Sequence, residues 1–295
     1  MRPDTLLTIY EIRIQDSECR EKLNPDDLRK LLGPKLLGCH FESDFAFLFC
    51  EGPVNIERLL RSNPRLSLME THLLRYDEWQ DGASAAPIVM GPLTIHAPGE
   101  ALVSQGSQDK DAFRPYGYVR DLPPITLDPG LAFGYGGHTT TKACLNFLLR
   151  IYSPKNQKLP QGVLDLGTGT GVLALAAARL GARDVLGVDY SHLAVDIAQI
   201  NLKQNNLEDR VTFVYGEAAD YASHPAELLI ANIPMFVHLD LLEKGAFSKR
   251  KYLVISGVLP DEASVLIQRL ESAYRVKVLD NDRDDRWSSW LLEMN

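Results

Sequence analysis

The sequence is poor in several features that would assign it to a specialised class of protein. It has four cysteines in 295 residues, Cys19, Cys39, Cys50 and Cys144, and none of them forms a C-x-x-C pair. We therefore expect free thiols in a reducing compartment, with neither a disulfide scaffold nor a metal site. No run approaches the ~20 consecutive apolar residues of a membrane span, and residues 1–15 lack the apolar core of a signal peptide. These absences predict a soluble, cytoplasmic protein.

An excess of positive charge is also missing. The chain has 31 Lys and Arg against 39 Asp and Glu, a net charge of −8, and both residues 1–97 and residues 98–295 are net acidic. A protein that binds nucleic acid through phosphates needs a basic surface, so we expect no direct nucleic-acid binding. The sequence has no internal repeat or low-complexity tract, and its 45% hydrophobic and 24% charged residues are ordinary globular values.

The length suits about two domains, and the pattern of residues changes near residue 98. Residues 1–97 mix strand-like and helix-like segments, which is typical of a small α+β domain. Here Asn24 and Pro25 can start a helix that we expect over residues 24–37. The other segments are predicted as strands over 6–14, 45–50, 66–76 and 93–96 and a helix over 54–61. Residues 98–126 are rich in proline and glycine and form a connector whose length favours a lid or a substrate contact.

Residues 127–295 alternate regularly between short apolar runs and amphipathic segments. This alternation predicts an α/β fold with a doubly wound, mostly parallel seven-stranded sheet, closed by an antiparallel C-terminal hairpin over 275–279 and 287–294. The hairpin turn is expected at residues 280–282. Strands are predicted over 163–166, 185–188, 211–215, 228–231 and 252–255, and helices over 138–151, 172–180, 191–204, 236–246 and 261–272.

A glycine loop follows the first of these strands directly. Asp165, Gly167, Gly169 and Gly171 form the pattern D-x-G-x-G-x-G ahead of a helix. A dinucleotide site needs G-x-G-x-x-G, which would require glycine where the chain has Val172. The pattern favours S-adenosylmethionine (SAM), which has no phosphate and whose ammonium and sulfonium groups suit an acid at the strand end. A NAD site and a purely structural glycine turn stay open as alternatives.

The ends of the next strands also have residues suited to this ligand. Asp189 can accept hydrogen bonds from two ribose hydroxyls, or is simply a solvated acid. Tyr190 can stack on an adenine or pack in the core, and Glu217 can accept from an adenine amino group. Asn232 follows the fourth strand, where a methyl acceptor would arrive, although capping or turn formation before Pro234 is the alternative.

The string ahead of the first core helix is more specific. Residues 127–141 read LDPGLAFGYGGHTTT, and they resemble LDPGLAFGTGTHPTT, the signature of the PrmA family of ribosomal-protein methyltransferases. The resemblance covers residues 125–295; over residues 1–97 it is limited to size, α+β texture and position. It continues, in the family's order and spacing, through VLDLGTGTG (163–171), GVDYSHLAV (187–195), ANI (231–233), SGVL (256–259) and Trp287.

This resemblance implies a class I, Rossmann-like methyltransferase domain over residues 127–295. The implied activity is SAM-dependent N-methylation of lysine or α-amino groups of a ribosomal protein, which residues 1–97 would recognise. Asn232 and His138 are the candidate catalytic residues, although His138 serves equally well as a structural hydrogen-bonding group in its loop. The family pattern implies SAM contacts from Thr141, Gly167, Asp189 and Asn232, with Phe133, Gly134 and His138 flanking the methyl donor; Asp165, Gly169, Tyr190 and Glu217 complete the candidate set.

The chain departs from the family pattern around the acceptor side. Tyr135 and Gly137 stand where the family has threonines, Thr139 replaces a proline, and the connector is longer. A different protein acceptor, a small-molecule acceptor and a non-catalytic SAM-binding module are therefore alternatives.

Overall fold

The computed structural model describes residues 5–15, 19, 23, 25–42, 45–75, 87–98, 118, 122–128 and 137–294. By their contacts the residues divide into two compact units, one of residues 1–84 and 191–193 and the other of residues 85–190 and 194–295. None of the helices in the described part of the chain combines the length and the hydropathy that a membrane span requires. Cys50 and Cys144 are buried free thiols, as the sequence predicts.

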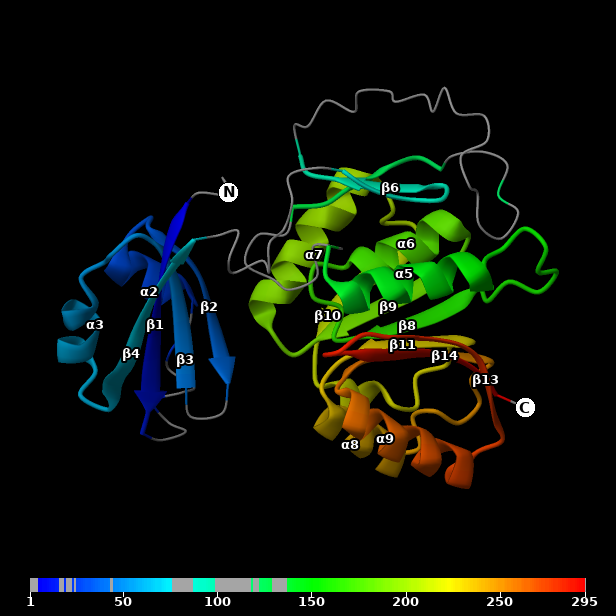
Figure 1. The fold of residues 1–295 in the computed structure, drawn as a ribbon. Coiled ribbons are helices and arrows are strands. Elements are labelled where there is room, and N and C mark those ends of the chain that lie inside the picture. Colours follow the sequence, from blue (N-terminus) through cyan, green and yellow to red (C-terminus); the bar gives the residue numbers. More distant parts are fainter. Residues whose placement is uncertain are drawn as a thin grey trace. The chain divides into compact units, whose positions relative to one another are not determined.

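The first unit is a four-stranded antiparallel sheet in the order β2-β3-β1-β4, with two helices packed on one face (Figure 1). Its core joins Tyr10, Ile12 and Leu48 of the sheet to Leu28 and Leu59 of the helices. The elements are β1 (Leu6–Ile14), α2 (Pro25–Leu32), β2 (Leu36–Glu42), β3 (Phe45–Glu51), α3 (Ile56–Ser62) and β4 (Leu66–Arg75).

One predicted element of this unit is wrong in extent. The helix expected through Leu37 ends at Leu32, and Leu36 already begins strand β2. Gly33 has φ +83°, a left-handed conformation that ends a helix, and Pro34 cannot continue one. The apolar pair Leu36-Leu37 therefore belongs to the sheet.

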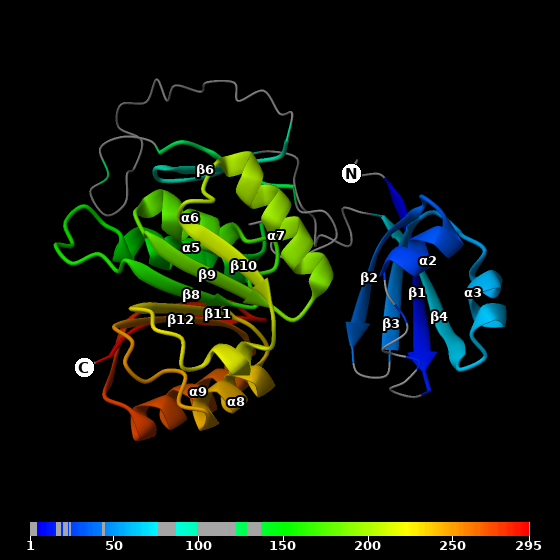
Figure 2. The ribbon, with the colours of Figure 1, turned by 180° about the vertical axis from the view of Figure 1, so that it is seen from behind.

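The second unit contains a seven-stranded sheet in the order β10-β9-β8-β11-β12-β14-β13. The first five strands are parallel, and β14 runs antiparallel to both β12 and β13. Helices α5, α6 and α7 cover one face and α8 and α9 the other (Figures 1 and 2), which confirms the doubly wound sheet with its antiparallel hairpin. The strands are β8 (Gly162–Leu166), β9 (Asp184–Asp189), β10 (Val211–Tyr215), β11 (Leu228–Asn232), β12 (Tyr252–Val258), β13 (Val276–Arg283) and β14 (Ser288–Met294), and the helices α5 (Thr139–Ile151), α6 (Val172–Leu180), α7 (His192–Asn205), α8 (Met235–Glu243) and α9 (Pro260–Ala273), with a 3-10 turn at Ala218–Tyr221.

The position of the hairpin turn differs from the prediction. Asp280, Asn281 and Asp282 lie within β13, and the turn follows them. The Asp284 carboxylate accepts hydrogen bonds from the backbone amides of Arg286 and Trp287, which closes the turn there. A local side chain-to-backbone bond thus outweighs the turn propensity of the Asp-Asn-Asp run.

A small third sheet, β5-β6-β7, also belongs to the second unit. It consists of β5 (Ile88–Met90), β6 (Leu93–His96) and β7 (Ile125–Thr126), and β6 pairs in parallel with β7. The boundary predicted from the sequence at residue 97 placed β5 and β6 in the amino-terminal domain. The division into a recognition domain (1–97), a connector (98–126) and a methyltransferase domain (127–295) stays a prediction.

Candidate functional site

The parallel strands bring four predicted site positions to one edge of the sheet. Strand β8 ends before the glycine loop, β9 ends at Asp189, β10 ends just before Glu217, and β11 ends at Asn232. Their registers align these ends, since Ala231 pairs with Leu166 and Tyr215 pairs with Asp189. Carboxyl ends of parallel strands are where open α/β sheets bind ligands, so the edge is the candidate site.

The glycine loop is held against β9 by backbone and side-chain bonds. The amides of Gly167 and Thr168 both donate to the Val188 carbonyl, at 2.9 and 3.0 Å. The Gly169 amide donates to Oδ2 of Asp189 at 2.9 Å. This bond fixes the carboxylate beside the loop, where a ligand lying along the glycines would meet it.

Gly167 shows why the first position of the loop is a glycine. Its φ is +72°, and a Cβ atom there would lie 2.4 Å from Cγ2 of Ile233. Ile233 directly follows Asn232, so the glycine lets the loop after β8 approach the turn after β11 closely.

Asp165 does not lie at the surface of the site. Its side chain is 1% exposed, and Oδ2 accepts a hydrogen bond from the Thr168 hydroxyl at 2.6 Å. Burial raises the pKa of this carboxyl to about 7, against the effect of the Thr168 bond, and the nearby Asp189 charge raises it further. Asp165 therefore holds the loop through Thr168, and its carboxyl keeps its proton to a higher pH than an ordinary aspartate does.

Asn232 is oriented by a short chain of polar groups. Its Nδ2 donates to Oγ1 of Thr140 at 3.2 Å. The Thr140 hydroxyl lies 2.7 Å from Nδ1 of His138, and this ring nitrogen also accepts from the Thr140 amide at 3.3 Å. The tautomer consistent with these bonds has an unprotonated Nδ1, so the Thr140 hydroxyl donates to it. The Asn232 carbonyl oxygen accepts no hydrogen bond from the described residues and can accept from a ligand.

His138 directly precedes helix α5 and caps it through the same nitrogen. Its ring also packs edge-on against Trp287, with ring centroids 5.6 Å apart. His138 therefore makes structural hydrogen bonds at the start of α5, and its catalytic role stays a prediction.

The remaining predicted site residues differ in their surroundings. Thr141 is 1% exposed, and its hydroxyl has no hydrogen-bond partner among the described residues. Tyr190 is 46% exposed, so the alternative of core packing is wrong. Glu217 is exposed and precedes the 3-10 turn without capping it through its side chain. Phe133 and Gly134 lie outside the described residues.

Sequence reasoning missed two residues at this edge. Thr140 orients Asn232, but three consecutive threonines gave no local signal to single it out. His238 of α8 is fully buried, and its Nε2 lies 3.0 Å from the Ser256 carbonyl, which also accepts from the Ile233 amide. Burial lowers the pKa of this imidazole to about 4, so it is neutral near pH 7. His238 therefore braces the turn that follows Asn232.

A doubly wound sheet with a D-x-G-x-G-x-G loop, an acid ending the second strand and Asn-Ile-Pro after the fourth defines the class I methyltransferase type of Rossmann-like fold. The residues present fit SAM, because Asp189 meets the loop where a ribose would lie and Thr141 has an unused buried hydroxyl. The family model for ribosomal protein L11 methyltransferase (PrmA) matches residues 119–293. The chain belongs to this family.

Relatives and a solved structure support the same family. The chain is 36% identical over 166 residues to a ribosomal protein L11 methyltransferase of Clostridium perfringens, covering 56% of this chain and 51% of that protein. It is 37% identical over 165 residues to one from Pelotomaculum thermopropionicum, covering 55% and 52%. The crystal structure of the ribosomal protein L11 methylase from Lactobacillus delbrueckii subsp. bulgaricus matches with a TM-score of 0.56 at 27% identity, over 71% of this chain and 98% of that chain. The chain spans about half the length of the curated relatives it matches.

Proposed function

We propose that this protein is a SAM-dependent protein N-methyltransferase whose acceptor is a lysine or α-amino group of a ribosomal protein. The observation that carries the proposal is Asn232, whose amide group is fixed by Thr140 and whose carbonyl oxygen is left to accept from an incoming N–H. Family membership supports a methyltransferase, and the names of the relatives support a ribosomal protein as acceptor. Such an acceptor would place the reaction in the cytoplasm.

The bound cofactor would supply a methyl group activated by its sulfonium. The protein's task is then to hold and align the reactants, since an aligned displacement gains rate from positioning alone. Asp189 and the Gly167–Gly171 loop would hold the cofactor, with Tyr190 and Glu217 toward its adenine. Asp165 would keep the loop in shape through Thr168.

An amine acceptor must lose a proton before it can attack, because the ordinary lysine pKa is about 10.4. Desolvation at the edge of the sheet lowers that pKa. The Asn232 carbonyl oxygen would accept an N–H of the neutral amine and so direct its lone pair toward the methyl group. We assign His138 to orienting Asn232 through Thr140, with its Nδ1 already engaged.

The test is methyl transfer from labelled SAM to purified ribosomal proteins. We expect label on one of them, Asn232→Ala to lower kcat by more than it lowers SAM affinity, and Thr140→Val to give a smaller loss of the same kind. Thr212→Val, an exposed position on β10 that has no part in the site, is the matched control. SAM binding without label on any ribosomal protein would contradict the ribosomal acceptor.

A second acceptor class is favoured by one specific observation. The family model begins at residue 119 and so does not cover the preceding part of the chain. Tyr135, Gly137 and Thr139, which differ from the family pattern, come directly before Thr140, the residue that contacts Asn232. A different protein or a small molecule would then receive the methyl group. Label appearing only on other components of a cell extract would support this class, and SAM binding without label on any component would support a non-catalytic module.

A further inference from the structure

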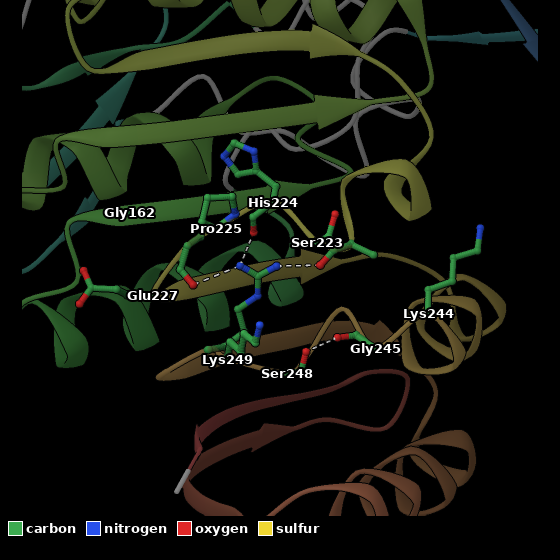
Figure 3. Close-up of a pocket in the computed structure, with 12 residues that line it drawn as sticks. Gly162, Ser223, His224, Pro225, Glu227, Lys244, Gly245, Ser248 and Lys249 are labelled. Carbon is green, nitrogen blue, oxygen red and sulfur yellow. Dashed lines mark hydrogen bonds between the residues drawn. The ribbon is translucent and has the colours of Figure 1, made fainter.

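The second unit has a pocket of about 730 Å³ away from the candidate active site. Its walls include Gly162, the first residue of β8, and the segments that lead into β11 and β12 (Figure 3). It therefore lies at the amino ends of the strands, whereas the glycine loop and Asn232 follow their carboxyl ends. The volume lies within the ~300–1,000 Å³ range of small-molecule sites.

The charged side chains of this pocket are mainly positive. Lys244, Lys249 and Arg250 line it, with Glu227 as the opposing carboxylate. Figure 3 shows Glu227 on the opposite side from Lys244, with its carboxylate turned outward, and this carboxylate accepts the Gln161 amide at 2.6 Å. A local excess of cations contrasts with a chain whose net charge is −8.

Arg250 is a buried cation, and no carboxylate of the described residues pairs with it. The residue is 7% exposed, and its guanidinium donates to the backbone carbonyls of Ala222, His224, Ala226 and Ala246. These bonds use four of the five N–H donors, and the fifth, on Nη2, has no acceptor among the described residues. Carbonyl dipoles hold the group in place but leave its charge uncompensated, which is uncommon for a buried charge.

Lys249 adds a second cation at the pocket, and its side chain is exposed. Its ammonium has no acceptor among the described residues, and its φ is +59°, in the left-handed region. Glycine or asparagine would occupy that conformation with less strain. Lys244 lies 3.5 Å from Asp240 in a half-exposed ion pair that a stronger anion can replace.

We propose that this pocket binds the phosphate group of a small phosphorylated ligand. Arg250 and Lys249, neither of which pairs with a carboxylate in the described part of the chain, match the charge of a phosphate, which is close to −2 at pH 7. Lys244 and the hydroxyl groups of Ser223 and Ser248, which also line the pocket, provide further polar contacts. The site is independent of methyl transfer and uses none of the residues assigned to it.

The experiment is calorimetric titration of the full chain with inorganic phosphate at low ionic strength, with acetate as the monoanionic comparison. The double variant Lys244→Gln, Lys249→Gln is expected to bind phosphate about tenfold more weakly, since each exposed cation contributes on the order of 1 kcal/mol or less. The matched control is Lys203→Gln, Lys277→Gln, two exposed lysines on α7 and β13 that should leave the affinity unchanged. Both double variants are surface changes, and their Tm values check folding.

A second measurement, by NMR, reports on Arg250 directly. The ¹⁵N resonances of its side chain should shift as phosphate is added to the unmodified protein, and acetate should have little effect. Absence of binding, or an equal loss of affinity in both double variants, would overturn the proposal. A single-stranded RNA is the last probe. If the parent protein binds it, phosphate does not displace it and the Lys244→Gln, Lys249→Gln variant no longer binds it, the pocket is a nucleic-acid site instead.

Discussion

The burial of Asp165 beneath the glycine loop leads to a quantitative prediction for Asp165→Asn. The carboxyl of Asp165 has a pKa of about 7 in the folded protein, raised from an ordinary value of 3.8 mainly by desolvation. Between these two values the folded state holds a proton that the unfolded state has released. Stability from this group is therefore full at low pH and is lost as the pH rises toward 7.

The magnitude follows from the size of that interval. Each pH unit between the two pKa values removes about 1.4 kcal/mol of unfolding free energy, so the full cost of charging Asp165 is on the order of 4 kcal/mol. Asparagine has the same shape, can still accept the Thr168 hydroxyl and never becomes charged. Relative to the parent, the variant should gain about 1.4 kcal/mol per unit from pH 5 to pH 7 and level off above.

The assay is urea unfolding of parent and variant at several pH values, followed by circular dichroism. Taking the difference between the two proteins removes the contribution of every other titrating group. Asp196→Asn, an exposed position on α7, controls for loss of one negative charge. A parent-to-variant difference that does not change with pH would refute the reasoning. SAM affinity should survive in Asp165→Asn, because this carboxylate bonds to Thr168 inside the protein; its loss would show that Asp165 contacts the cofactor directly.

Three further predictions concern the same edge of the sheet. Asp189→Asn should lose most SAM affinity by calorimetry, and an unchanged affinity would contradict the ribose role. Gly257→Ala should lower both Tm and SAM affinity, since its φ is +80° and its Cβ would lie 2.7 Å from the Ile233 carbonyl oxygen. Gly181→Ala is the control: its φ is +128° with open space around it, so backbone strain of about 1–2 kcal/mol should lower Tm alone. Burial lowers the pKa of His238 to about 4, so the parent protein should lose up to about 3 kcal/mol of stability as the pH falls from 6.5 toward 4. His238→Phe should remove this acid sensitivity in urea unfolding. If the dependence of stability on pH is unaltered in the variant, His238 is not the source of the acid sensitivity.

The sequence by itself determined the sheet of the second unit and the order of its elements. Short apolar runs alternating with amphipathic segments admit few arrangements, because crossover connections between parallel strands are right-handed. The glycine loop, Asp189 and Asn232 were predicted for the same reason, since each directly follows a strand and the ends of parallel strands meet at one edge. The hydrophobic pattern was less informative in the first unit. There Gly33, with its left-handed backbone, ends helix α2 at Leu32, before the Leu37 that the pattern predicted.

The tertiary structure alone decided what the polar side chains at this edge contact. Asp165 and Asp189 each stand at the end of a strand in the sequence, yet their surroundings differ. Asp165 is buried and its pKa is raised, whereas the Asp189 carboxylate accepts a hydrogen bond from the Gly169 amide of the loop. Thr140 rather than Thr141 contacts Asn232, and His238 of α8 bonds to the Ser256 carbonyl of β12. Burial and hydrogen-bond geometry arise from contacts between distant segments, so no local pattern contains them. The unpaired charge of Arg250 likewise became visible only when the fold showed that its partners are four carbonyls.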